Sequence, residues 1–310
     1  MKNELYNFAS PSVTSDFAGE LALPYIHAGV ISAPTIAGGN VTLLEGIRFK
    51  AQLPVMATSG LIIAGACDFS TAATTTLTDT ALVVTEQMVN LQLCKKQFRT
   101  WWSGSAYNND NAVPQDYADA ILLYVAKLVQ ADIENTIWNG EVGGATGYAA
   151  FDGFKEIRED GGASTELVNP IDASSTVLAG LQEIILAMPS SIEGDFENTK
   201  LYVNPVTISA YNLAVGQTGD GYNSAVANGS TNNFLGYSLV ASAGIPKGEC
   251  MLAKKTNLFV GVGSADSLEM AQALDMTPLD GSDNYRITMR FAVGCQIGVL
   301  ADTVYFVNEA

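Results

Sequence analysis

The chain has 310 residues, of which 48% are hydrophobic and only 15% are charged, and its formal net charge is −17. This composition excludes a disordered chain, which needs low hydrophobicity and high charge. The negative charge argues against a nucleic-acid partner held through phosphate contacts. So few charges leave part of a monomer's surface apolar, which favours association with other chains. The alternative is a domain rich in glycine and alanine with an uncharged polar surface.

The sequence supports neither a membrane-spanning helix nor a secretory signal peptide. No apolar run approaches the roughly 18–20 residues that a membrane-spanning helix needs, and Met1 to Phe8 is polar and acidic where a signal peptide would be apolar. The four cysteines, Cys67, Cys94, Cys250 and Cys295, are far apart in the sequence. We therefore expect buried thiols in a reducing compartment, and no zinc site built on thiolate pairs.

The first 40 residues show no sustained periodicity and contain prolines at 11, 24 and 34. They predict an extended arm that packs against another surface, because such a segment cannot bury itself. Residues 41–50 are strand-like, a loose stretch rich in Ala, Gly and Thr follows, and 81–102 is a long β-forming run. Two strand-like runs around a mobile tip predict a projecting hairpin, which is marginal in water without a partner surface.

One short segment is basic. Lys95, Lys96 and Arg99 stand beside Trp101 and Trp102. We interpret the segment as the solvated end of a strand; the alternative is a binding site for single-stranded nucleic acid.

The clearest helix is predicted from Pro114 to Trp138, with proline in its first turn and Asn139-Gly140 closing it. At 1.5 Å per residue it is a rod of about 37 Å, expected to be buried around most of its circumference. The predicted polar face is narrow, and the apolar residues recur at helical spacing. The polar face holds Asp116, Asp119, Lys127, Gln130 and Glu134; the apolar set is Tyr117, Ile121, Tyr124, Val125, Leu128, Val129, Ile133 and Ile137.

The second half of the chain alternates between helix and strand signals. A helix is predicted from 174 to 188, a strand over 200–204, and a helix that starts at Pro205. A loop rich in Gly, Ser and Asn follows over 216–233. The remainder predicts strands over 237–241, 251–253, 257–262, 267–273, 284–293 and 296–307. The chain is therefore predicted to be mixed α+β.

The residues of common catalytic sites are missing from the sequence. His27 is the single histidine, and no G-x-S-x-G or Walker-type motif is present, so we expect no enzyme and no cofactor or metal site. Gly261-Val262-Gly263 resembles the start of a dinucleotide-binding turn, but Asp266 takes the place of the third glycine; it predicts a turn between strands. Glu156, Glu159 and Asp160 predict an acidic surface, and a β-rich hydrolase with a carboxylate pair stays open as an alternative.

Four stretches resemble major capsid proteins of tailed bacteriophages, the HK97-like fold. Ala131 to Gly140 is similar to the end of the family's spine helix, and Leu201 to Pro205 resembles the strand-to-helix entry of its axial domain. Phe234 to Gly248 resembles a recurrent strand segment, and Arg286 to Val299 is similar to the final strands. The resemblance covers nearly the whole chain by the order of its elements.

The resemblance implies an α+β fold in four parts: an N-terminal arm (1–38), an E-loop hairpin (39–80), a peripheral domain with the spine helix (81–170 and 286–310) and an axial domain (171–285). It implies hexamers and pentamers in an icosahedral shell around double-stranded DNA, assembled in the host cytoplasm. Portal, scaffolding or decoration proteins would be partners, with no membrane and no sequence-specific DNA binding. An encapsulin-type nanocompartment shares the fold and is the alternative. The candidate contacts between subunits are Tyr25, His27, Phe49, Lys50, Leu61, Ile62, Tyr222 and Asn223.

Two features of the family are not matched. The chain has no extra helical region of the kind that serves as a built-in scaffold, which predicts a separate scaffolding protein or none. Covalently cross-linked members join an E-loop lysine to a neighbour's asparagine. Nothing in the sequence selects Lys50 for that role, so we predict no cross-link.

Overall fold

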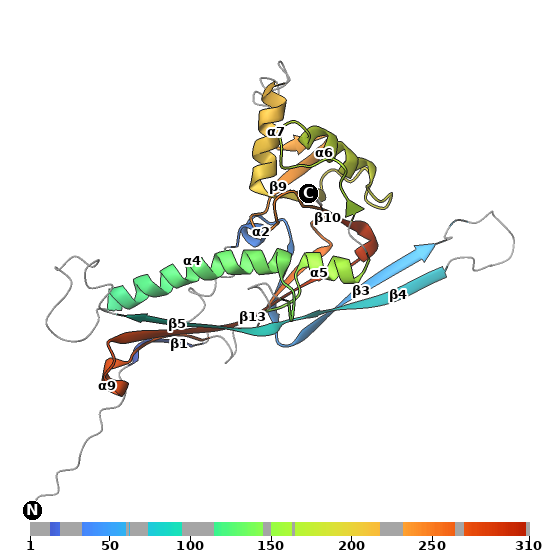
Figure 1. Ribbon diagram of the computed structural model, residues 1–310. Helices are drawn as coiled ribbons and strands as arrows, with labels where there is room; N and C mark the ends of the chain where they lie inside the picture. The colour runs from blue at the N-terminus through green and yellow to red at the C-terminus, as the bar shows by residue number, and fades with distance from the viewer. Residues whose placement is uncertain are drawn as a thin grey trace, which may run out of the picture. The chain divides into compact units, whose positions relative to one another are not determined.

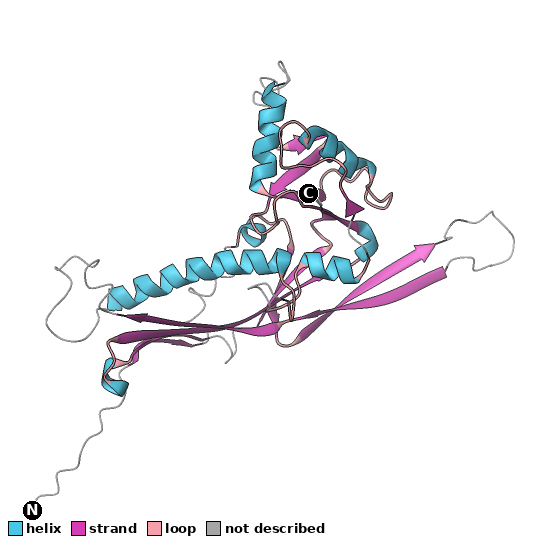
Figure 2. Cartoon of the chain, viewed as in Figure 1, coloured by secondary structure: helices cyan, strands magenta, loops and turns pink. Residues whose placement is uncertain are grey.

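The computed structural model describes residues 13–18, 33–59, 62, 74–94, 115–144, 150–162, 165–217, 232–263 and 270–307 (Figure 1). The chain forms two compact units. The first contains residues 1–33, 86–133 and 263–293, and the second contains 34–85, 134–262 and 294–310. Figure 2 shows that both helices and strands contribute to the fold.

The first unit is built on antiparallel strands. Strand β1 (Val13–Ala18) pairs with β12 (Met270–Asp275), which pairs in turn with β13 (Asn284–Ile297). A short helix, α9 (Thr277–Asp280), and Gly281 at a φ of 73° make the turn between β12 and β13. The irregular arm predicted for residues 1–40 therefore contains a strand. Its hydrogen-bond partners lie some 250 residues away, so local periodicity could not reveal it.

Strand β5 (Thr85–Cys94) also pairs with β13. Glu86 lies 3.7 Å from Arg290, and Arg286 Nε donates to Gln92 Oε1 at 3.2 Å. The two strands therefore run antiparallel, and the end of β5 lies beside the start of β13. The predicted run over 81–102 is interrupted at Val84, and its residues 95–102 lie outside the described part of the chain.

The long helix is α4 (Gln115–Asn139), as the sequence predicted to within a residue at each end. In the second unit its last turn packs against aromatic side chains. The Trp138 ring is fully buried, 5.4 Å from Phe154 and 5.3 Å from Tyr202 between ring centroids. Gly244 permits this contact, because a Cβ there would lie 2.3 Å from the Glu134 carbonyl oxygen.

The second unit has a six-stranded sheet whose order is β6-β14-β10-β7-β9-β8. The strands are β6 (Thr165–Glu166), β7 (Thr199–Val203), β8 (Asn233–Phe234), β9 (Tyr237–Ala241), β10 (Cys250–Lys254) and β14 (Thr303–Val307). Helices α6 (Val177–Leu186) and α7 (Pro205–Gln217) complete this lobe. Helices α6 and α7 and strands β7, β9 and β10 match the prediction closely. Strands β6 and β8 were not predicted, and β14 is only the last part of the strand predicted over 296–307.

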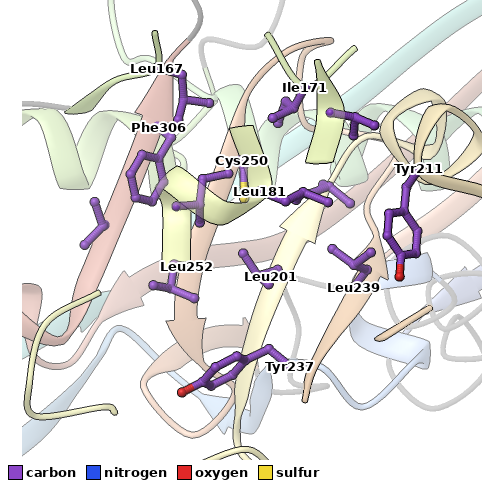
Figure 3. Packing of buried hydrophobic residues seen from close by; sticks show 14 of the residues in the cluster. Leu167, Ile171, Leu181, Leu201, Tyr211, Tyr237, Leu239, Cys250, Leu252 and Phe306 are labelled. Carbon is purple, nitrogen blue, oxygen red and sulfur yellow. The ribbon is translucent and has the colours of Figure 1, made fainter. Parts of the chain in front are cut away.

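One face of this sheet forms the lobe's core (Figure 3). Alternate residues along each strand point to the other face. Leu201, Leu252 and Phe306 pack in one buried cluster with Leu181 of α6 and Tyr211 of α7. The neighbouring strand residues Tyr202, Met251 and Tyr305 are also fully buried, and Tyr202 meets Trp138. Both faces of the central strands are therefore covered by the chain itself.

Near the chain's start and end, shorter elements complete the second unit. Helix α2 is Pro34–Ala37, and β2 (Thr42–Ile47) lies next to β11 (Leu258–Gly263), which pairs with β13. Helix α5 is Phe154–Asp160, and a short 3₁₀ turn, η3 (Leu300–Asp302), precedes β14.

One interpretation of a glycine and one predicted strand boundary were wrong. Gly261 lies inside β11 and does not form a turn; a Cβ there would lie 2.8 Å from the terminal methyl carbons of Ile47 and Leu82, so glycine leaves room for these two buried side chains. The predicted break between 293 and 296 is also absent, since β13 continues to Ile297. At Gly294 a Cβ would lie 2.1 Å from the Val83 carbonyl oxygen, so this glycine too serves close approach.

Candidate self-association surfaces

A two-stranded hairpin offers an open surface in the second unit. Strand β3 (Lys50–Ser59) pairs antiparallel with β4 (Thr74–Val83) over ten residues each. The sequence predicted a hairpin here, but placed its strands at 41–50 and from 81 onward. Those runs are β2 and β5, and the hairpin is built from the Ala- and Thr-rich stretch between them. Long threonine-rich strands pair well without an obvious hydrophobic pattern.

The base of the hairpin is fixed to the second unit. Leu82 is fully buried, Thr80 Oγ1 donates to the Gly298 carbonyl at 3.3 Å, and Gln296 Nε2 donates to the Ala81 carbonyl at 3.1 Å. Val84 N donates to the Phe49 carbonyl at 3.2 Å. These contacts hold the last residues of β4, whereas those before Thr80 are exposed.

One face of the hairpin is open along its length, and we call it the outer hairpin face. Met56 and Leu77 lie directly opposite each other on this face, and they are 70% and 66% exposed. A cross-strand pair of this kind would be stabilising if covered, since its two side chains already lie together. Its members are Lys50, Gln52, Pro54, Met56 and Thr58 on β3 and Thr75, Leu77, Asp79, Ala81 and Val83 on β4.

Of the eight predicted contact residues, the structure describes three. Phe49 is 71% exposed, Lys50 is exposed at the start of β3, and Ile62 is 97% exposed. Their exposure leaves them available to another chain, and their role as contacts stays a prediction. The other five, Tyr25, His27, Leu61, Tyr222 and Asn223, lie outside the described residues. Sequence analysis missed Met56 and Leu77, although Met56 follows Gln52 and Pro54 at the two-residue spacing of one strand face.

A second open apolar surface lies on α4 in the first unit. Leu123, Tyr124, Lys127 and Leu128 are all exposed and share one side of the helix; we call them the α4 stripe. The sequence placed Tyr124 and Leu128 in the buried apolar set, and that prediction was wrong. Val125, Val129 and Ile133 are buried as predicted. Periodicity alone cannot tell an exposed apolar residue from a buried one when the two are neighbours on the helix.

The second unit also buries an acid that the sequence placed on the polar face of the helix. Glu134 is 2% exposed. Its carboxylate accepts hydrogen bonds from the Thr35 backbone N at 3.1 Å, from Thr35 Oγ1 at 2.5 Å and from Trp138 Nε1 at 3.3 Å. A buried carboxylate is stable only when donors surround it. Here the donors come from α2, a partner that helical spacing could not predict.

A polar cluster joins α5 to the covered face of the lobe's sheet. Lys155 Nζ lies 2.9 Å from Glu249 Oε1 and 5.7 Å from the centre of the Tyr305 ring. The Tyr305 hydroxyl donates to Glu249, and burial followed by the Glu249 charge raises the pKa of that hydroxyl. All three groups are engaged with one another, so the cluster binds elements together and offers no open polar group for a reaction.

The described thiols are buried or half-buried. Cys250 and Cys295 are buried, as predicted, and burial raises the pKa of both thiols; Cys94 is half-buried, and Cys67 lies outside the described part. No group of three metal-binding side chains gathers among the described residues. Within the same residues, no helix is long and apolar enough to cross a membrane.

Solved structures resemble this chain over most of its length. The capsid of an empty GTA particle, determined with C5 symmetry, covers 90% of this chain and 91% of its own, at 13% identity and a TM-score of 0.56. The procapsid of satellite phage P4, which includes its size-determination protein, covers 96% and 91% at 10% identity and a TM-score of 0.59. A virus-like particle from Pyrococcus furiosus covers 92% and 97% at 11% identity and a TM-score of 0.54. No protein-family model and no curated protein matches the sequence.

Proposed function

We propose that this chain, which has the α+β HK97-like fold of major capsid proteins of tailed bacteriophages, assembles with copies of itself into a closed protein shell. The observation that carries the proposal is the outer hairpin face, where no described element of the same unit covers the apolar pair Met56 and Leu77. Burying apolar area contributes about 25 cal/mol per Å². The proposal assigns no reaction to the chain.

The shell is built from hexamers and pentamers in icosahedral symmetry and encloses a double-stranded DNA genome. The likeness to a capsid determined with C5 symmetry supports an assembly of this kind. The net charge of −17 supports enclosure without tight binding, because an acidic wall repels phosphate. Assembly takes place in the cytoplasm of a bacterial host, with portal, scaffolding or decoration proteins as further partners.

Three parts of the chain provide the contacts between copies. The outer hairpin face covers apolar surface on a neighbour, and the α4 stripe offers such a surface in turn. The N-terminal arm, predicted over 1–38, provides the third contact through residues other than those of β1 and α2, which are held by their own chain. Each contact is modest by itself, but repetition over a closed shell gives the assembly its stability.

A shell that encloses something other than a genome is the second candidate. The chain resembles a virus-like particle with a TM-score of 0.54, close to the 0.56 and 0.59 for the GTA capsid and the P4 procapsid. An encapsulin-type compartment would be such a shell. The shape of one subunit therefore does not separate the two candidates, whereas the contents of the particle do.

Electron microscopy and analytical ultracentrifugation of the purified full chain test the proposal. We expect closed particles that sediment far faster than one chain, with or without added scaffolding protein. Particles recovered from the natural source should contain DNA that resists nuclease until the shell is opened. A chain that stays monomeric at all concentrations, also with the proteins of its own cluster of genes, would overturn the proposal. Particles filled with protein and free of DNA would select the second candidate.

A further inference from the structure

A groove lies at the base of the hairpin, inside the second unit. Its volume is about 670 Å³, within the range of pockets that bind ligands. Three elements line it: the hairpin through Val55, Thr78 and Thr80, the segment around α5, and the end of β13 with the residues after it. The remaining lining residues are Asp152, Ile157, Asp160, Gly161, Gln296, Ile297, Gly298, Val299 and Leu300. The proposed shell contacts leave this groove without an assigned partner.

The groove combines an apolar floor with negative charge. Ile157, Ile297 and Val299 supply apolar surface, and Asp152 and Asp160 supply carboxylates. Burial, and then the like charges of Asp160, Glu141, Glu159 and Asp152, raise the pKa of Glu156.

The cations of α5 are already engaged elsewhere. Lys155 pairs with Glu249, while Arg158 Nε donates to the Thr303 carbonyl and its Nη1 to the Gly162 carbonyl, both at 3.1 Å. An occupant of the groove must therefore bring its own positive charge, together with apolar side chains for the floor. We call this surface the acidic groove.

One segment of the chain has that chemistry. Residues 95–102, Lys-Lys-Gln-Phe-Arg-Thr-Trp-Trp, hold three of the chain's 15 basic residues and no acidic residue. Phe98, Trp101 and Trp102 supply the apolar side chains. In a chain with 32 acidic residues against 15 basic ones, such a segment is an exception. Arginine and the aromatic residues are also the types that most often anchor protein interfaces.

The proposed shell places copies of this chain side by side, so the segment of one copy is available to the groove of another.

We propose that the acidic groove receives the basic and aromatic segment 95–102 of a second copy of this chain. Each copy then offers one groove and one segment, so the contact is heterologous and propagates around a ring of subunits. The inference rests on the proposed shell function and adds a charge-matched contact that fixes which neighbour docks where. Opposite charges across an interface contribute more to the choice of partner and register than to the affinity itself.

Cross-linking between two variants of the full chain tests the contact directly. One variant carries Gln97→Cys, which keeps all three cations, and the other carries Thr78→Cys on the groove rim. The two are mixed, assembled and oxidised, and dimers are read on a non-reducing gel. The matched control replaces Thr78→Cys by Asp79→Cys, the next residue, which is exposed on the outer hairpin face. We expect at least about fivefold more mixed dimer with Thr78→Cys than with Asp79→Cys.

Charge reversal supplies the second readout. Asp160→Arg changes a residue that lines the groove, and its control Glu159→Arg makes the same change one exposed residue earlier, outside the lining. We expect Asp160→Arg to raise the chain concentration needed for half-assembly about tenfold. The contact recurs throughout the shell, so a small loss of affinity at each copy adds up. Glu159→Arg should shift it less than about threefold. Lys95→Glu, Lys96→Glu and Arg99→Glu together with Asp160→Arg should recover part of the loss.

The outcomes separate the two claims. If the unchanged chain forms particles but the Thr78→Cys and Asp79→Cys variants cross-link equally, the groove contact is wrong and the shell proposal stands. A disulfide that forms only within one chain carrying both Gln97→Cys and Thr78→Cys would also overturn the contact with a second copy. If the unchanged chain never forms particles, both the shell and the contact fail.

Discussion

The β3–β4 hairpin and the six-stranded lobe belong to the same unit, yet they cover their apolar side chains in opposite ways. In the lobe, one face of β7 and β10 packs on α6 and α7 and the other meets Trp138 and its neighbours, so Leu201, Leu252 and Phe306 are fully buried. The hairpin has two strands and one covered end. Met56 and Leu77, its paired apolar residues, are about two-thirds exposed.

The contrast separates folding from assembly within one chain. A lobe that covers both faces of its sheet is stable by itself, whereas a two-stranded hairpin with an open face becomes stable by meeting a partner. Substitutions in the lobe should therefore change the free energy of unfolding, and those on the outer hairpin face should change assembly. Four substitutions test this division, beginning with the largest expected effect on the fold.

Leu201→Ala should lower the free energy of unfolding by about 3 kcal/mol, since it removes buried methyl groups and leaves a cavity in the lobe's core. Urea denaturation of the unassembled chain measures it. Leu213→Ala on the exposed side of α7 is the control, and should change the same quantity by less than about 0.5 kcal/mol. Equal effects at the two positions would mean that the lobe is not the self-sufficient part of the chain.

Glu134→Ala should cost about 2 kcal/mol, because the Thr35 and Trp138 donors lose a buried acceptor. Glu134→Gln keeps one carbonyl oxygen and should cost less. Replacement of the exposed Glu193 by Ala is the control for loss of an acid. If Glu134→Ala and Glu193→Ala change the free energy of unfolding equally, the attachment of α2 to α4 does not contribute to the stability of the fold.

Much of the lobe could be predicted from sequence because its signals are local. Proline opens α7 at Pro205, and a short apolar run precedes it as β7. The errors at Glu134, at Gly261 and at the predicted strand end before Gly294 share another cause. Each residue is fixed by an atom far away in the sequence: Thr35 for Glu134, Leu82 for Gly261 and Val83 for Gly294. Local periodicity carries no information on such partners.

The candidate surfaces were predictable only in part. The hairpin was expected, but its strands were assigned to the more hydrophobic runs on either side, since threonine-rich strands lack an apolar pattern. Exposure on α4 was also missed, because Tyr124 and Leu128 look like core residues until the packing around the helix is known. The acidic groove needs β4, α5 and β13 together, so only the folded structure reveals it.

Leu77→Asp should leave the free energy of unfolding within about 0.5 kcal/mol of the original, because the residue is exposed in the single subunit. It should nevertheless abolish particles or reduce their yield at least about tenfold, since a charge would be buried in a repeated contact. Thr76→Asp, the preceding residue on the other face of the strand, is the matched control. Sedimentation measures the yield. Normal particles from Leu77→Asp would contradict the role given to the outer hairpin face.

The smallest expected effect is that of Glu156→Gln on α5. Burial, and then the neighbouring acids, raise the pKa of Glu156 above its ordinary 4.5, so the folded chain holds this proton more tightly than the unfolded chain does. The stability linked to the group is therefore complete below about pH 4.5 and is lost as the pH rises through the folded-state pKa. At neutral pH the charged form is a slight cost to the fold, which glutamine removes.

Thermal unfolding at several pH values measures the difference between Glu156→Gln and the original chain. At pH 7 the variant should be the more stable by less than about 0.5 kcal/mol, since water screens charges near the surface, and the gap should close below pH 4.5. Glu193→Gln, away from α5, should show no such pH-dependent gap. A gap that persists in acid would place the effect in packing. In that case α5 would contribute to folding stability through packing, as the lobe does. The surface that serves assembly would then begin only at the rim of the acidic groove.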